Sequence, residues 1–244
     1  PGLQGSVWDE IPVWATATMS PCVDVEETMV SIIAPGSWIN NFHHTFLGEY
    51  DIPYIEQLRT VKWHPSGEKP GDPKSYRYSS ANPLVLQFIC EAVEKKPFGT
   101  LLQERVWEKT GFRNPMQLHL APDGMGVGYG MMSTTPEDML RFAMLHTPSW
   151  NKVASERIVT DEMDKIYRST ARVQTYEGSV EQGYNLEWFG HSPKSQGVMW
   201  DCVFEDGAMF KHGNLGQGIY FDPKRDFCSM GFGVADNTAG IDYA

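Results

Sequence analysis

Apolar positions recur at helical spacing directly after a loop rich in proline and glycine at 65–73. The apolar residues of this helical pattern are Leu84, Val85, Phe88, Ile89, Ala92 and Val93. Asn82 precedes them as a candidate N-cap, and Pro83 suits the first turn because its missing N–H needs no partner there. Lys95 and Lys96 end the predicted helix at the pole of its dipole that favours cations.

Later in the chain the period changes from that of helices to that of strands. A second helix is predicted over residues 98–110, and a third is predicted to begin at Thr135, which precedes Pro136 and two acidic residues. From about Tyr184 onward, short β-prone runs replace the helical pattern. These runs are 200–204, 208–211, 218–221 and 227–234, with 222–226 as the turn of a hairpin between the last two. Helices followed by strands predict an α+β chain.

Composition limits the class of protein. The 244 residues are 41% hydrophobic and 12% aromatic, which is enough to bury a core in one large domain or two interleaved ones. A net charge of -11 argues against nucleic acid or an anionic membrane as a partner, because both would repel the chain. Since no apolar run approaches the roughly 20 residues of a membrane helix, no membrane span is predicted.

Cysteines and histidines are spaced unlike metal ligands. The four cysteines (Cys22, Cys90, Cys202 and Cys228) form no CxxC pair, so we expect buried thiols that act as small hydrophobes. The histidines show no HExxH or similar spacing, and we expect them at the surface or in ordinary hydrogen bonds. They include His43, His44, His64, His119, His146 and His191. Neither a metal nor another cofactor is therefore predicted.

A tyrosine-containing segment, Tyr76-Arg77-Tyr78-Ser79-Ser80-Ala81-Asn82, stands between the proline loop and the first predicted helix. It resembles the Y-x-N or Y-S-N motif of class C β-lactamases and related esterases, and Ser80 in the third position resembles nylon-oligomer hydrolases. The resemblance implies that Tyr78 is the base that activates a serine, with Ser80 and Asn82 supporting the motif. A serine nucleophile is weak at neutral pH, and a tyrosinate beside a lysine ammonium can activate it. The alternative is that Tyr78 merely packs at the end of a loop.

Three further stretches extend the resemblance. Residues 128–139 look like the Gly-rich turn of the same families, and 157–159 like the segment that follows it. Residues 211–223 are similar to the strand with the K-T-G or H-x-G motif, which lines the acyl pocket and supplies an oxyanion N–H. Such a donor contributes about 3–4 kcal/mol to the transition state.

Four residues of that strand are the candidate oxyanion and substrate-binding group. His212 stands at the position of the motif's Lys or His and precedes Gly213, whereas Asn214 replaces the usual Gly. Asn214 and Leu215 are therefore both candidates for the oxyanion donor. The alternative for His212 is an ordinary hydrogen bond at the end of a strand.

Taken in order, from about Trp8 to Val234, these stretches resemble β-lactamase-fold serine hydrolases, which include penicillin-binding-protein-like esterases. The resemblance implies an antiparallel sheet flanked by helices, with a mainly helical subdomain, as in β-lactamases and transpeptidases. We expect one incomplete domain over 1–244, mainly helix and loop from about 20 to 180. The strand-rich part, from about 181 to 244, would complete the sheet.

The family's nucleophile lies in an S-x-x-K motif at the start of a buried helix, upstream of the tyrosine motif. Ser66–Lys69 matches the spacing but is surrounded by prolines and glycines, and Ser149–Lys152 follows the other motifs instead of preceding them. We interpret both as chance matches. Residues 8–23 resemble the stretch just after the nucleophile helix, although the Gly normally found after M-x-S is absent. We therefore expect the nucleophile helix and first strands on a preceding segment or a companion chain.

The resemblance implies a serine hydrolase that acts through an acyl-enzyme on a small-molecule ester, amide or β-lactam. The alternative is a catalytically inactive β-lactamase-like protein that serves as a binding or scaffold protein. The two differ in whether a serine of the intact protein reacts with fluorophosphonate or penicillin reagents.

Overall fold

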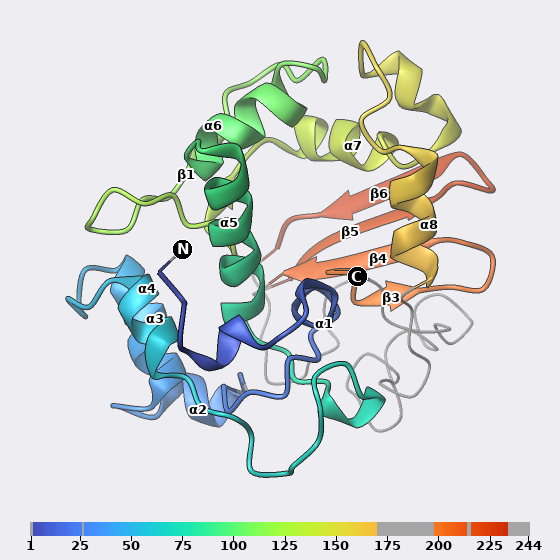
Figure 1. The fold of residues 1–244 in the computed structure, drawn as a ribbon. Coiled ribbons are helices and arrows are strands. Elements are labelled where there is room, and N and C mark those ends of the chain that lie inside the picture. The colour runs from blue at the N-terminus through green and yellow to red at the C-terminus, as the bar shows by residue number, and fades with distance from the viewer. Residues whose placement is uncertain (1, 26, 170–197, 214–215, 234–244) are drawn as a thin grey trace. The chain divides into compact units, whose positions relative to one another are not determined.

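The computed structural model describes residues 2–25, 27–169, 198–213 and 216–233, which belong to two compact units (Figure 1). Unit 1 comprises Pro1–Leu101 and Gln117–Ser133, and unit 2 comprises Leu102–Met116 and Thr134–Ala244. Helices and antiparallel strands make up both units, so the α+β class predicted from the sequence is confirmed. No helix in the described ranges has the length and apolarity that a bilayer crossing demands.

Unit 1 is mainly helical. Its elements are η1 (Val7–Asp9), α1 (Val13–Ala17), α2 (Met29–Ile33), α3 (Trp38–Phe46), α4 (Tyr54–Thr60), η2 (Pro73–Ser75), α5 (Ala81–Glu94), β1 (Gln117–Leu118) and β2 (Met132–Ser133), with α6 (Phe98–Leu102) leading into unit 2. The two short strands pair antiparallel, with Gln117 opposite Ser133. The core of the unit gathers Leu84 and Val85 of α5 against Phe42 and Leu58.

The helix predicted after the proline loop is α5. It begins at Ala81, so the prediction of Asn82 as its N-cap is wrong. Ser80 holds the cap position, and Asn82 lies within the first turn with its side chain fully buried. The Asn82 Nδ2 group donates to Met19 Sδ at 3.0 Å and to the Arg77 carbonyl at 3.4 Å. These interior partners explain why the amide does not cap the helix. Pro83 still falls in the first turn, where its missing N–H costs nothing.

Two residues of α5 are more exposed than predicted. Cys90 is exposed and Val93 is 73% exposed, because the buried face of the helix follows Ala81, Leu84 and Val85. None of the four cysteines takes part in a disulfide bond. Cys22 and Cys202 are buried and Cys228 is half-buried, so the expectation of buried thiols fails for Cys90.

Unit 2 combines helices with an antiparallel sheet. Its elements are η3 (Gln103–Trp107), α7 (Pro136–Met144), η4 (Pro148–Lys152), α8 (Asp161–Ser169), β3 (Cys202–Val203), β4 (Met209–Gly213), β5 (Gln217–Asp222) and β6 (Phe227–Gly231). The predicted helix over 98–110 is α6 followed by η3, which is a π-helical turn. Thr135 caps α7 as predicted, since its side chain accepts a hydrogen bond from the Asp138 N–H.

The strands of unit 2 pair in the order β3-β4-β5-β6, and each face of the sheet carries its own apolar cluster. Met209 packs on one face with Ala143 of α7 and Tyr167 of α8, the helix that lies over this face in Figure 1. Phe210, the next residue of β4, packs on the other face with Cys202. Consecutive residues point to opposite faces because the side chains of a strand alternate.

The turn between β5 and β6 is the hairpin turn predicted at 222–226. Asp222 is almost fully buried, and its Oδ1 accepts the N–H groups of Lys224 and Arg225, each at 3.0 Å. Phe221 pairs with Cys228 across the two strands. The aspartate therefore closes the hairpin through its own side chain.

Asp138 is expected to be a main anchor of unit 2. Its buried carboxylate accepts the N–H groups of Arg113 at 2.8 Å and Asn114 at 3.0 Å, and the Thr135 hydroxyl at 2.9 Å. Asp138→Ala should lower the free energy of unfolding by about 2–4 kcal/mol, because three donors lose their buried, charged acceptor. Urea denaturation measures the loss. The neighbouring Glu137→Ala, at an exposed ion pair, should cost less than about 1 kcal/mol; equal losses would contradict the anchor.

Candidate active site

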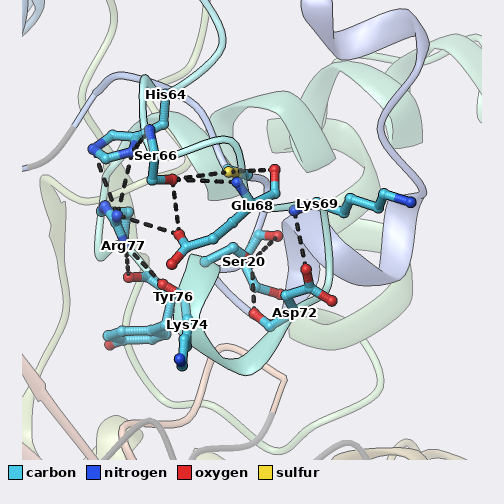
Figure 2. Close-up of polar contacts among 11 residues, drawn as sticks. Ser20, His64, Ser66, Glu68, Lys69, Asp72, Lys74, Tyr76 and Arg77 are labelled. Carbon is cyan, nitrogen blue, oxygen red and sulfur yellow. Dashed lines mark hydrogen bonds and ion pairs between the residues drawn. The ribbon is translucent and has the colours of Figure 1, made fainter.

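The loop at 64–77, which leads into Tyr78, is fastened to residues 19–22 of unit 1 (Figure 2). The Ser20 carbonyl accepts the Gly71 N–H at 2.8 Å and the Ser75 hydroxyl at 3.1 Å. The Arg77 N–H donates to the Met19 carbonyl at 2.7 Å. The start of the Tyr78 segment is therefore fixed to a buried part of the chain.

The first S-x-x-K match lies within this loop and is not helical, as expected. The exposed Ser66 hydroxyl donates to the Glu68 carboxylate at 2.9 Å, and Gly67 has a φ of 74° (Figure 2). The Lys69 N–H bonds to Asp72 Oδ2 at 3.0 Å. Ser66 and Lys69 thus lack the helix that would bring a nucleophile and its lysine onto one face.

Glu27 holds the segment that carries Tyr78. Its N–H donates to the carbonyl of the half-buried Tyr78 at 3.2 Å. Its carboxylate accepts the Ser80 N–H at 2.6 Å and the Ser80 hydroxyl at 3.1 Å. His43 of α3 bonds through Nε2 to the same carboxylate at 2.8 Å. Unit 1 therefore brings Tyr78 and Ser80 together on one short turn that leads into α5, and Asn82 lies in the first turn of that helix.

The sequence patterns did not reveal Glu27 or its contact with His43. Glu27 lies in an irregular stretch before α2 and forms part of no motif, and His43 is 16 residues away from it in the chain. The sequence expectation of ordinary hydrogen bonds for the histidines is met at His43, but no spacing identifies the partner. Only the folding of α3 beside the Tyr78 turn brings the two side chains together.

Tyr54 and Tyr129 are also close to this region, yet neither suits the role of a base. Their hydroxyl groups lie 2.8 Å apart. Burial raises the pKa of Tyr54 to about 12, and burial, together with the neighbouring Tyr54, raises the pKa of Tyr129. Both phenols consequently stay protonated at neutral pH.

The Gly-rich turn that contains Tyr129 depends on a close approach at Gly128. A Cβ atom at this position would lie 2.3 Å from Gln87 Oε1 and 2.9 Å from Phe98 Cε1. The Gly128 N–H instead donates to Gln87 Oε1 at 2.9 Å. Glycine is therefore required for this turn to pack on α5.

At the end of β4 in unit 2, Lys211 and His212 share one buried carboxylate. Lys211 Nζ lies 2.9 Å from both carboxylate oxygens of Asp201, and His212 Nδ1 lies 2.8 Å from Asp201 Oδ2. The His212 N–H donates to the same Oδ2 at 2.8 Å, and its carbonyl accepts from Lys211 Nζ at 3.1 Å. The His212 N–H is therefore already bound to Asp201.

Asp201 is the charged centre of this group. Burial alone would raise its pKa, but the charges of Lys211 and His212 and the hydrogen bonds from His212 outweigh burial and lower the pKa overall. Gly213 is close-packed, since a Cβ there would lie 3.0 Å from Gln217 Cβ. Asn214 and Leu215, the two candidate oxyanion donors, lie outside the described residues. Asp201 was not identified from sequence because it forms part of no motif.

Ser149, the serine of the second S-x-x-K match, makes a structural contact with Asp226. Ser149 lies in the 3-10 helix η4, where its hydroxyl donates to Asp226 Oδ2 at 2.7 Å and its N–H donates to Asp226 Oδ1 at 3.0 Å. Lys152 is exposed. The buried Ser149 thus ties η4 to the β5–β6 turn.

Three histidines of the described ranges bond to separate partners. His43 contacts Glu27, His44 contacts Glu49, and His119 Nε2 contacts the Phe46 carbonyl at 2.9 Å. Within those ranges, no cluster of three or more His, Cys, Asp or Glu residues is arranged to hold a metal ion. His191 lies outside the described residues.

Asp201→Asn should destabilise unit 2 by about 3 kcal/mol at pH 7, because Lys211 would keep its charge without a carboxylate partner. Since the folded-state pKa of Asp201 is lowered, its contribution is complete above the unfolded pKa of about 4 and is lost as pH falls below that value. The difference in unfolding free energy between wild type and variant should therefore narrow from pH 5 to pH 3.

Chemical denaturation at several pH values tests this expectation. Asp161→Asn is the matched control, because Asp161 pairs with Arg157 at an exposed site and should contribute less than about 1 kcal/mol. A difference for Asp201→Asn that does not change with pH would contradict an ionised Asp201.

Comparisons with known proteins agree with this fold. A sequence model of the family described as Beta-lactamase matches residues 56–235. A solved structure from Bacillus anthracis, provisionally named 6-aminohexanoate-dimer hydrolase, superposes with a TM-score of 0.66 at 18% identity. The alignment covers 93% of this chain and 56% of that chain, so the present chain spans little more than half the length of its structural neighbour. The search of curated proteins finds no match. Because the family model covers well over half of the residues, the chain belongs to the beta-lactamase family.

Proposed function

We propose that the chain is the larger part of a serine hydrolase that forms an acyl-enzyme with a small-molecule ester, amide or β-lactam. Family membership over residues 56–235 carries this proposal, because the matched region contains both the Tyr78 turn and the end of β4. The name of the structural neighbour supports including linear amides among the substrates to be tried. Hydrolysis requires no cofactor in this scheme.

In the proposed mechanism, a serine from a segment outside residues 1–244 attacks the substrate carbonyl. A lysine of that segment and Tyr78 accept the serine proton and return it to the leaving group. The end of β4, with His212 and Gly213, lines the acyl pocket, and the N–H of Asn214 or Leu215 stabilises the oxyanion. Water then cleaves the acyl-enzyme.

A buried acceptor beside the Tyr78 turn can take a donor from outside the described residues. Asn82 Oδ1 has no hydrogen-bond partner among the residues that the structure describes, although its side chain is fully buried. A buried amide oxygen without a donor costs about 1–3 kcal/mol, so such atoms are normally satisfied. A donor on the nucleophile-bearing segment would satisfy this oxygen.

The proposal makes one geometric demand. Tyr78 belongs to unit 1 and His212 belongs to unit 2, and both must face the same serine.

A fluorophosphonate probe on the complete protein tests the reaction class. We expect one labelled serine, located by peptide mass spectrometry on a segment outside residues 1–244. Label on Ser66 or Ser149 would overturn the placement of the nucleophile. A folded protein that takes up no label, and that cleaves neither p-nitrophenyl esters nor β-lactams, would be a binding or scaffold descendant of the family.

Tyr78→Phe should lower kcat/KM for a p-nitrophenyl ester by about 10²–10⁴-fold, because the base that activates the serine is lost. The thermal midpoint should stay close to that of wild type. Tyr76→Phe is the matched control, since this half-buried tyrosine lies two residues earlier in the same segment. Equal activity of the Tyr78→Phe variant and the control would remove Tyr78 from the mechanism.

A further inference from the structure

We propose that Glu27 is the positioning residue for Tyr78, an inference that rests on the proposed hydrolase function. Glu27 bonds on both sides of Ser79: its N–H reaches the Tyr78 carbonyl, and its carboxylate receives the Ser80 N–H and hydroxyl. Glu27 thus fixes the backbone before a fully buried serine through its main-chain N–H and the backbone after it through its side chain. The turn that presents the Tyr78 ring cannot shift without breaking several hydrogen bonds at once.

The charge of Glu27 strengthens its hydrogen bonds to the Tyr78 turn. The Glu27 side chain is 10% exposed and the His43 side chain is 20% exposed, so water competes weakly for the carboxylate. Hydrogen bonds to an ionised acceptor are about twice as strong as neutral ones. His43 approaches the same Oε1 as the Ser80 hydroxyl, so it orients the carboxylate and offsets part of its charge when protonated.

A nucleophilic role for Ser80 does not fit this arrangement. In a Ser-His-carboxylate triad the imidazole lies between the hydroxyl and the carboxylate. Here the carboxylate lies in the middle, with the Ser80 hydroxyl at 3.1 Å and His43 Nε2 at 2.8 Å from the same oxygen. A hydroxyl that donates to the carboxylate holds the turn instead of attacking a substrate.

Catalysis would depend on the hydrogen bonds between Glu27 and the Tyr78 turn, because proton transfer is sensitive to small displacements of the phenol. A misplacement of about 1 Å costs about 10²-fold in rate. Glu27 therefore acts on the rate through the location of the Tyr78 phenol, without touching substrate itself.

The chain contains a matched control pair. His44, the residue next to His43 in α3, bonds to Glu49. The His44 and Glu49 side chains are 41% and 59% exposed. Glu49→Gln removes the same kind of glutamate–histidine contact at the surface, where it should have little effect.

The test compares Glu27→Gln with Glu49→Gln in the complete protein. Glutamine keeps the size of the side chain and an oxygen for the Ser80 N–H, but it loses the charge. We expect kcat for a p-nitrophenyl ester to fall about 10- to 100-fold in Glu27→Gln, with KM within about twofold of wild type. Glu49→Gln should match wild type in both constants.

Fluorine NMR supplies a readout that does not require turnover. With 3-fluorotyrosine at position 78, Glu27→Gln should shift or broaden the resonance, whereas Glu49→Gln should leave it unchanged. An unchanged resonance together with unchanged kcat would overturn the positioning role. A lower thermal midpoint with wild-type kcat per folded molecule would also overturn it, because Glu27 would then be structural only.

The two proposals fail in different ways. If wild type neither hydrolyses the ester nor reacts with fluorophosphonate, the hydrolase function fails, and the fluorine resonance alone decides whether Glu27 holds position 78. If wild type is active and Glu27→Gln is equally active, the function stands and the inference about Glu27 fails.

Discussion

Carboxylates with little exposure to solvent accept main-chain N–H groups and stabilise each unit of this protein from within. Glu27 accepts from Ser80, Asp138 from Arg113 and Asn114, Asp201 from His212, and Asp222 from Lys224 and Arg225. A charged acceptor makes a stronger hydrogen bond than a neutral one, and a buried charge without such partners would be prohibitively costly. Some of the Asp and Glu residues that give the chain its net negative charge therefore have a structural role as hydrogen-bond acceptors.

This constraint links stability to the candidate site. The proposed mechanism uses two segments, and one such carboxylate bonds to each of them. Glu27 bonds to the Tyr78 turn, and Asp201 bonds to the end of β4. Lys211 and His212 both bond to the Asp201 carboxylate. Because the pKa of Asp201 is lowered, this carboxylate is ionised at neutral pH and attracts the Lys211 ammonium group. The same bonds that order these segments would preorganise them for chemistry.

The chain belongs to the beta-lactamase family and spans little more than half the length of its structural neighbour. Ser66 is bound to Glu68 in a loop, and Ser149 is bound to Asp226 beside the β5–β6 turn. Each S-x-x-K serine in the chain thus has a structural partner, and neither lies in an α-helix, since Ser66 is in a loop and Ser149 is in a short 3-10 helix. The proposed mechanism accordingly takes its serine from neither position.

The sequence by itself determined the α+β class, the cap of α7 at Thr135, the hairpin turn at Asp222 and the strands around it, because these depend on local periodicity and turn chemistry. It also indicated the Tyr78 and His212 segments through a family resemblance, and their catalytic roles stay predictions. Only the tertiary structure decided that Asn82 turns inward, that Cys90 and Val93 lie outside the core, and that Glu27 and Asp201 bind those segments. These features depend on contacts between residues far apart in the chain, such as Glu27 with Ser80, which leave no periodic or local signal in the sequence.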